Sequence, residues 1–202
     1  MSWITRPLIA CVVVATLGCS SSSKQAVAPA TTVPTANQTP RTQVVNFEVG
    51  DQKRTAILAV PADRSKPLPL VFAFHGHGGS GRNFQQKMLI EKLWPQALVL
   101  YPDGLPGHPG KTDPTGTKPG WQTVVGEGGD RDLAFFDAML KSEEDFFNVD
   151  RDRIYVVGHS NGSAFASLLL NQRGRAIAAT ANLSAQPPAR LLSSDPVRSM
   201  FM

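Results

Sequence analysis

Apolar and polar residues follow one another along this chain in a pattern that predicts short buried strands separated by helices. Two candidate strands, at 44–49 and 54–60, flank a polar turn at Gly50-Asp51. Three further runs are apolar at almost every position, and they are 69–74, 97–102 and 153–158. Runs of this kind are typical of strands covered on both faces, as in a parallel sheet.

Between these runs the spacing of apolar residues changes to that of helices. One set recurs at intervals of three, four and seven and so shares a helix face: Leu133, Phe136, Leu140 and Phe147. We expect the Asp130 carboxylate to cap this helix and residues 164–170 to form another. Alternating strands and helices predict an α/β fold with right-handed crossovers. Residues 104–129, rich in glycine and proline and without a period, are expected to form a functional surface loop.

Length and composition indicate one globular domain. The chain has 202 residues, of which 42% are hydrophobic and 18% charged, as in ordinary globular proteins. The net charge of +4 comes from basic residues scattered along the chain, with no Lys/Arg block and no basic stripe between aromatics. This distribution argues against a nucleic-acid partner.

Residues 1–19 are typical of an export signal peptide. A positively charged start precedes an apolar stretch at 8–17 that is too short to span a membrane. The glycine before Cys19 and the serines after it resemble a bacterial lipoprotein signal, in which the cysteine becomes lipidated. Thr16 departs from that motif, so Cys11 or ordinary signal cleavage are the alternatives. The resemblance implies export to the bacterial cell envelope, or secretion, with a lipid anchor in the membrane at Cys19.

Residues 20–42 are predicted to be a disordered linker. They are rich in Ser, Thr, Ala, Pro and Gln and have too few large apolar side chains to offset the entropy of ordering. The globular domain is therefore assigned to 43–202. Both cysteines, Cys11 and Cys19, precede this domain, so it has no disulfide framework and no cysteine-based metal site.

The sequence Gly158-His159-Ser160-Asn161-Gly162 stands between an apolar run and a helical pattern. A Gly-x-Ser-x-Gly pattern in this context predicts a nucleophile elbow, which holds Ser160 at the C-terminal edge of the sheet. Gly158 and Gly162 are expected where the tight turn leaves no room for side chains. The following helix would direct its positive end toward developing negative charge. The alternative is an ordinary turn whose serine caps the helix.

A second glycine-rich segment, FHGHGGSG at 74–81, also directly follows an apolar run. Acyl transfer requires backbone donors for the tetrahedral oxyanion, and small residues let the backbone approach it closely. We expect the N–H groups of His77 and Asn161 to be these donors. The segment resembles the His-Gly-rich oxyanion loop of α/β-hydrolases. The residues expected to support it are His75, Gly76 and Gly78.

Residues 69–183 resemble the esterase family of polyhydroxybutyrate depolymerases and family 1 feruloyl and acetylxylan esterases. The matching segments are PLVFAFHGHGG, LVLYPDG, Trp121, GDRDLAFFDAML and NVDRDRIYVVGHSNGSAFASLL. The resemblance implies an α/β-hydrolase fold, with three layers and a mostly parallel sheet, and hydrolysis of carboxylic esters without a cofactor. Ser163 is a departure, because the family usually has glycine there. By the same resemblance Trp121 lies near the substrate mouth, and packing on the core is an equally open alternative.

A serine nucleophile also needs a base, normally a histidine oriented by a carboxylate. In this fold the chain order is Ser, acid, His, but no histidine follows Ser160 and Asp195 is the only carboxylate after it. We interpret 198–202 as the start of the next core strand, so that the α/β-hydrolase domain is incomplete at its C-terminal end and the triad acid and base are missing. The alternative is that an upstream histidine serves as base: His75, His77, His108 or His159.

No metal site is predicted. The Asp-Arg-Asp triplets at 130–132 and 150–152 lack a histidine, and helix capping and pairing with arginine explain them. The predicted function is a serine carboxylic ester hydrolase of the cell envelope, acting on small-molecule or polymer esters of the feruloyl, acetyl-polysaccharide or polyester type, and inactive or incomplete at this length. The alternative is a non-catalytic envelope lipoprotein, either a degenerate hydrolase or a carbohydrate-binding scaffold. A serine peptidase of the same fold is a third, weaker hypothesis.

Overall fold

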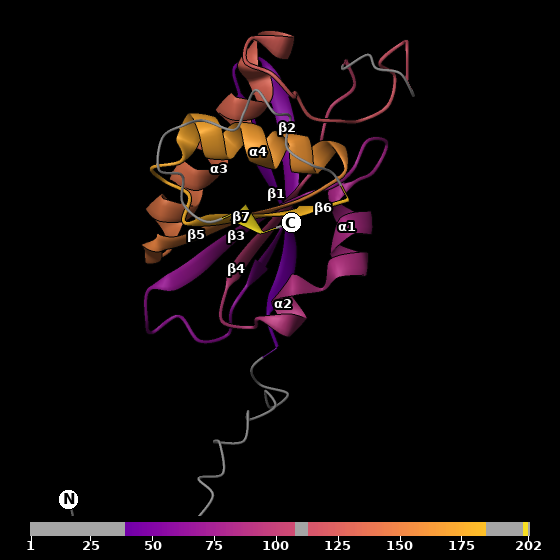
Figure 1. Ribbon diagram of the computed structural model, residues 1–202. Coiled ribbons are helices and arrows are strands. Elements are labelled where there is room, and N and C mark those ends of the chain that lie inside the picture. The colour runs from indigo at the N-terminus through magenta and orange to yellow at the C-terminus, as the bar shows by residue number, and fades with distance from the viewer. Residues whose placement is uncertain (1–38, 108–112, 185–199, 202) are drawn as a thin grey trace, which may run out of the picture. The chain divides into compact units, whose positions relative to one another are not determined.

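The computed structural model describes residues 39–107, 113–184 and 200–201 (Figure 1). Cys19, His108 and Asp195, which the sequence singled out, lie outside the described residues. The elements in chain order are β1 (Arg41–Val49), β2 (Gln52–Val60), β3 (Leu68–Phe74), α1 (Gly81–Met88), α2 (Ile90–Leu93), β4 (Leu98–Pro102), the 3-10 helix η2 (Glu127–Asp130), α3 (Arg131–Phe146), β5 (Val149–His159), α4 (Asn161–Arg173), β6 (Ala179–Leu183) and β7 (Met200–Phe201).

The strands form one mixed sheet in the order β1-β2-β4-β3-β5-β6-β7. β1 pairs antiparallel with β2, and β2 pairs antiparallel with β4. The remaining pairs are parallel, with β3 in the middle between β4 and β5. The predicted α/β class with a mostly parallel sheet is therefore confirmed, and the carboxyl ends of β3 and β5 lie side by side.

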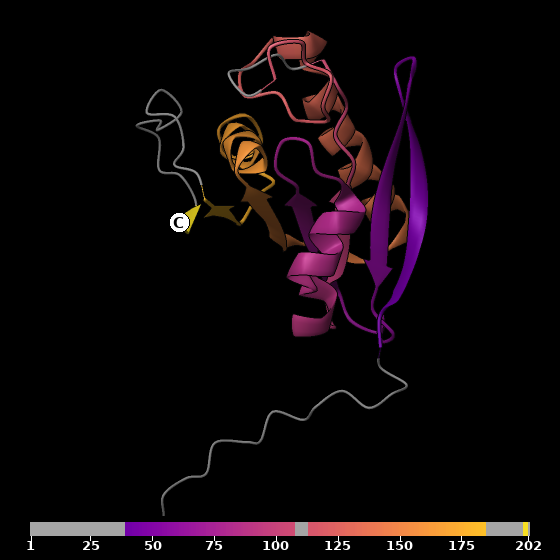
Figure 2. The same cartoon turned by 90° about the vertical axis from the view of Figure 1, so that its right-hand side faces the viewer.

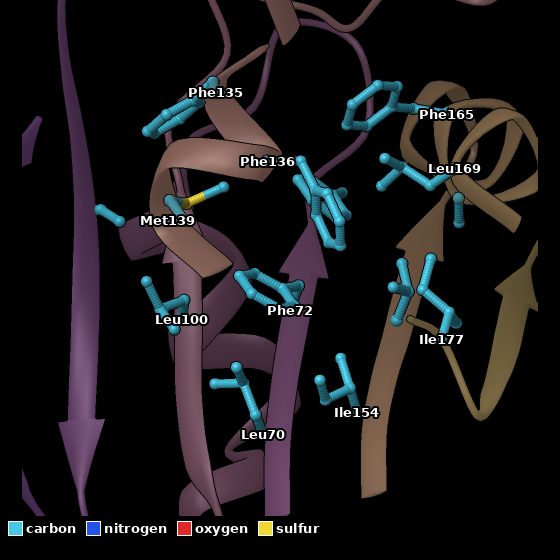
Figure 3. Packing of buried hydrophobic residues seen from close by; sticks show 14 of the residues in the cluster. Leu70, Phe72, Leu100, Phe135, Phe136, Met139, Ile154, Phe165, Leu169 and Ile177 are labelled. Carbon is cyan, nitrogen blue, oxygen red and sulfur yellow. The ribbon is translucent and has the colours of Figure 1, made fainter. Parts of the chain in front are cut away.

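Alternation of side chains along β3 explains why the sheet is covered on both faces. Leu70, Phe72 and Phe74 belong to a core cluster that includes buried residues of α3 and α4 (Figure 3). Val71 and Ala73 belong to a second cluster, with Phe84 of α1. Helices α1 and α2 thus cover one face while α3 and α4 cover the other (Figure 1; turned by 90° in Figure 2). All seven residues of β3 are buried, as their unbroken apolar run predicts.

The predicted strands and helices are present, with different limits at several ends. The hairpin strands are longer than expected, and β1 begins at Arg41, ahead of the domain boundary assigned to residue 43. β5 begins at Val149 instead of 153, and α4 begins directly after Ser160. Within 198–202, the range interpreted as the start of a core strand, the described residues Met200 and Phe201 form β7, which pairs parallel with β6 through Thr180 and Ala181.

The capping prediction for α3 is wrong. Asp130 precedes the helix with φ of 58°, and its side chain makes no capping hydrogen bond. Gln122 takes that role instead, because its Oε1 accepts hydrogen bonds of 3.2 Å from the backbone N–H groups of Asp132 and Leu133. Asp130 Oδ1 in turn accepts hydrogen bonds from Gln122 Nε2 at 2.7 Å and Gly126 N–H at 2.7 Å. The carboxylate therefore orients the residue that caps the helix.

Within the ranges that the structure describes, no helix has both the length and the apolar character needed to cross a membrane.

Candidate active site

Ser160 occupies the sharp turn between β5 and α4. Its backbone has φ of 52° and ψ of −114°, a strained conformation for a residue with a side chain. The turn is held by the Ser160 N–H, which donates to the Leu183 carbonyl at 2.9 Å, and by the Ser160 carbonyl, which accepts from Ser163 N–H at 2.9 Å. Ser160 is exposed, and its side chain makes no capping hydrogen bond to α4. The alternative of a serine that merely caps the helix therefore does not describe this turn.

Two glycines make the turn sterically feasible. A Cβ atom on Gly158 would lie 2.2 Å from the Gly162 carbonyl oxygen, and one on Gly162 would lie 2.3 Å from the Phe74 carbonyl oxygen. Both distances are far below van der Waals contact, so β5, α4 and the end of β3 approach one another at backbone distance. This close approach is what the sequence pattern predicts for an elbow.

Ser163, the departure from the family pattern, has a role of its own in the turn. Its hydroxyl lies 2.7 Å from the Gly158 carbonyl oxygen and 2.9 Å from the Leu183 carbonyl oxygen. The hydroxyl has one proton, which these two acceptors share. The Ser163 hydroxyl thereby links the carboxyl ends of β5 and β6, close to Ser160 in the chain, so a serine at this position reinforces the elbow.

The glycine-rich loop after β3 lies against the elbow. A Cβ atom on Gly76 would be 3.4 Å from Ser160 Cβ and 2.8 Å from His159 Nδ1. Gly78 has φ of 74°, and its N–H donates to the Pro119 carbonyl at 2.7 Å. The structure thus brings the loop and Ser160 together, as the sequence predicts. The assignment of the His77 and Asn161 N–H groups as oxyanion donors stays a prediction.

His75 is a structural member of this loop. Its ring is buried, and Nδ1 donates to the Gly76 carbonyl oxygen at 2.7 Å while Nε2 accepts the Gly104 N–H at 3.0 Å. Burial lowers the pKa of His75, which favours the neutral ring that this pair of bonds requires. Because both nitrogens are bonded, His75 is unsuited to accept a proton from Ser160.

His77 has a partner that sequence reasoning missed. Its Nε2 lies 3.2 Å from Asp113 Oδ2, and the ring is largely buried. The carboxylate also accepts Lys118 N–H at 2.8 Å, and this bond, ahead of those from Thr117 and His77, lowers the pKa of Asp113 to about 2. The only sequence signal was an aspartate opening the turn-forming run Asp-Pro-Thr-Gly-Thr, which gives no hint that it contacts a histidine 36 residues earlier.

Trp121 is completely buried. Of the two positions that the sequence left open, near the substrate mouth or packed on the core, the structure places it in the core. The indole stacks on Phe165 at 5.6 Å between ring centroids and meets Phe74 edge-on at 5.0 Å. Its Nε1–H donates to the His75 carbonyl at 2.9 Å. The Trp121 backbone also pairs with the side chain of Asn161, whose Oδ1 accepts Trp121 N–H at 2.8 Å and whose Nδ2 donates to the Trp121 carbonyl at 3.0 Å.

The described part of the chain contains no group of three or more His, Cys, Asp or Glu side chains arranged to hold a metal ion. The Asp150 triplet forms local pairs instead. Asp150 accepts Arg153 Nε at 2.6 Å and Asp152 N–H at 3.0 Å. Asp132 of the other triplet pairs with Arg54 in the core at 2.9 Å, with neither side chain exposed.

No protein-family model matches the chain, and no curated protein matches it. Solved structures do. A ferulic acid esterase is 14% identical with a TM-score of 0.52, and the match covers 72% of this chain and 60% of that one. An S-formylglutathione hydrolase from Staphylococcus aureus is 17% identical with a TM-score of 0.56, covering 81% and 66%. An acetyl xylan esterase from Aspergillus awamori is 16% identical with a TM-score of 0.52, covering 71% and 53%.

This likeness confirms the α/β-hydrolase fold. At 14 to 17% identity the likeness establishes the fold alone. The chain also spans only 53 to 66% of the length of these three neighbours.

Proposed function

We propose that this α/β-hydrolase domain belongs to a serine carboxylic ester hydrolase in which Ser160 is the nucleophile. The observation that supports this most is the strained backbone of Ser160, with φ of 52° at an exposed turn against which the Gly76 loop packs. Strain of this kind costs on the order of 1–3 kcal/mol and persists where the surroundings enforce it. The Ser160 backbone is held in this conformation because β5, α4 and the end of β3 are in contact at backbone distance. This arrangement exposes the Ser160 hydroxyl and serves no evident packing purpose.

In the proposed reaction Ser160 Oγ attacks the ester carbonyl, and the N–H groups of His77 and Asn161 stabilise the oxyanion. Asn161 is the first residue of α4, so its N–H is among those that no helix carbonyl can accept. The positive end of α4 adds to the stabilisation of negative charge there. Removing one oxyanion donor from a serine hydrolase typically lowers kcat by about 10²–10³-fold.

Ester hydrolysis also requires a base that accepts the Ser160 proton. Both nitrogens of His75 are bonded, and Nε2 of His77 is engaged with Asp113. The His159 ring lies against α1, with its centroid 6.3 Å from that of Phe84. We therefore propose that the base and its acid lie outside the described residues, in line with the order Ser, acid, His.

For the substrate we propose a feruloyl, acetyl-polysaccharide or polyester-type ester. The family resemblance of 69–183 supports it, as do two structural neighbours that are themselves a ferulic acid esterase and an acetyl xylan esterase.

For location we propose export by residues 1–19, a linker at 20–42 and lipid anchoring at Cys19. Radiolabelled palmitate fed to the expressing bacterium should label the protein and fail to label a Cys19→Ala variant, and an unlabelled wild type would refute the anchor.

A fluorophosphonate probe tests the proposed nucleophile. In a chain that also contains the proposed base and acid, Ser160 should become labelled and Ser160→Ala should abolish the label, whereas Ser163→Ala, which removes a neighbouring buried hydroxyl, should retain it if the variant is folded. Hydrolysis of p-nitrophenyl acetate that depends on Ser160 would extend the result to turnover. If such a chain is folded and the probe leaves it unlabelled, the second candidate is favoured, a non-catalytic protein on the same scaffold. The engagement of both His75 nitrogens is the observation that favours this candidate.

A further inference from the structure

Trp121 touches both segments that are expected to supply the oxyanion donors. We propose that it is a positioning residue that couples the Asn161 and His77 N–H groups, an inference that rests on the proposed function for the role of those two groups. The Trp121 indole N–H binds the His75 carbonyl at 2.9 Å, at the start of the glycine-rich loop. Its peptide groups bind the Asn161 side chain at 2.8 and 3.0 Å, on the other side of the site.

The Asn161 side chain is held in one orientation by this contact. An amide that both donates to and accepts from the same residue cannot rotate about its terminal bonds without losing both hydrogen bonds. Since Asn161 is also the first residue of α4, fixing its side chain restrains the peptide whose N–H is the proposed oxyanion donor. A serine hydrolase needs only the backbone of this residue, so the side chain has a task that the Gly-x-Ser-x-Gly pattern does not specify.

The residue before Trp121 lies between the two donor residues. A Cβ atom on Gly120 would be 2.9 Å from His77 Nδ1 and 3.1 Å from Asn161 Oδ1. The Pro119 carbonyl accepts the Gly78 N–H at 2.7 Å. Residues 119–121 therefore contact the glycine-rich loop at its start and its middle, and the elbow at Asn161. Together they form a bridge between parts of the chain that are more than 80 residues apart.

Trp121 is itself fixed, as a positioning residue must be. Its indole is fully buried between Phe74 and Phe165. The next residue, Gln122, donates its N–H to Asp132 Oδ2 at 2.9 Å, and Asp132 pairs with Arg54 in the core. The bridge is thus anchored to α3 and β2. A displacement of an oxyanion donor by about 1 Å can cost about 10²-fold in rate, so this rigidity has a catalytic consequence.

Amide hydrogen exchange measured by NMR tests the coupling whether or not Ser160 is reactive. Asn161→Ala removes both side-chain bonds to Trp121, keeps its backbone N–H and suits a helix start. We expect it to speed exchange of the hydrogen-bonded Gly78 and Gly79 amides at least about tenfold while the buried β3 amides keep their rates. Trp121→Phe should have the same effect, and the double variant should be no faster than either single one. Trp94→Phe, a half-buried tryptophan beside Tyr155, is the matched control.

Unchanged exchange at Gly78 and Gly79 would overturn the proposal, and so would acceleration that extends equally to β3, because that pattern means general destabilisation. Labelling by the fluorophosphonate probe then distinguishes failure of the positioning role from failure of the proposed function. If the wild type is labelled, both variants should be labelled at least about tenfold more slowly, and unchanged labelling rates would refute the positioning role. If the wild type is not labelled even with the proposed base and acid present, the proposed function fails, and the exchange measurement still decides whether Trp121 couples the two segments.

Discussion

Glu143 gives the sharpest prediction for the stability of this fold. The side chain, on α3, is only 2% exposed, and its Oε2 has no hydrogen-bond partner in the described part of the chain. Glu91 is also buried, but it accepts hydrogen bonds from Tyr101 Oη at 2.6 Å and Gln85 Nε2 at 3.2 Å. Burial without such compensation raises the pKa of Glu143 from 4.5 to about 7.

The direction of the effect on stability follows from proton linkage. Between pH 4.5 and 7 the folded state holds a proton on Glu143 that the unfolded state has released, so the free energy of unfolding falls as pH rises. Below pH 4.5 both states are protonated and nothing is lost. A rise of about 2.5 pKa units at 1.36 kcal/mol each corresponds to about 3 kcal/mol lost by pH 8.

Glu143→Gln should remove this dependence, because an amide keeps the shape of the side chain and does not ionise. Urea unfolding should find the variant close to wild type at pH 4 and more stable by up to about 3 kcal/mol at pH 8. Glu144→Gln is the control on the same helix: its carboxylate pairs with the exposed Arg151 at 2.8 Å, and it should change stability by less than about 1 kcal/mol at either pH. Stability curves of Glu143→Gln and wild type that run parallel with pH would refute the reasoning.

Three further substitutions test the elements that surround the site. Gly162→Ala should cost at least about 3 kcal/mol by urea unfolding because of its contact with Phe74, whereas Gly50→Ala, with φ of 61° in open space, should cost about 1 kcal/mol. Arg54→Met should cost about 3–5 kcal/mol by thermal unfolding, since Asp132 loses its charged partner in the core, and a second change of Asp132 to Leu should restore part of the lost stability. Asp113→Asn should flatten the fall of stability between pH 4 and 2, because the low pKa of Asp113 stabilises the fold above that range, and an unaltered acid limb in a pH titration would contradict this.

The sheet could be predicted from the sequence because its central strands are buried on both faces. A strand such as β3 has an apolar residue at nearly every position, and the short length of this run and the turn-forming residues around it favour a buried strand over a helix. The turn at Ser160 could be predicted for a different reason. The two glycines of the elbow stand at a fixed spacing because a side chain at either position would clash. The pattern is therefore visible in the local sequence, even though the Phe74 carbonyl that a Cβ on Gly162 would meet belongs to another strand.

Helices α1 and α2 were not predicted. The sequence of α1, GRNFQQKM, has a single fully buried large side chain, Phe84, so its apolar period is too weak to detect. β6 is missed because its five residues, ATANL, include only one large apolar side chain. These three elements are stabilised mainly by the sheet that they pack on or join, and tertiary context of this kind leaves little trace in local sequence.

The contacts that shape the candidate site join segments that are distant in the sequence, so local sequence patterns do not predict them. Asp130 has the right residue type and position to cap α3, yet Gln122 caps it, because the loop folds back and places an amide where the carboxylate was expected. Asp113 and His77 are likewise brought together by that loop. A sequence pattern predicts a structural feature only when a few neighbouring residues are enough to form it. The bonds from Trp121 to Asn161 and His75 connect three separate segments, so only the folded chain reveals that the residue first considered for the substrate mouth lies beneath the site and joins its two halves.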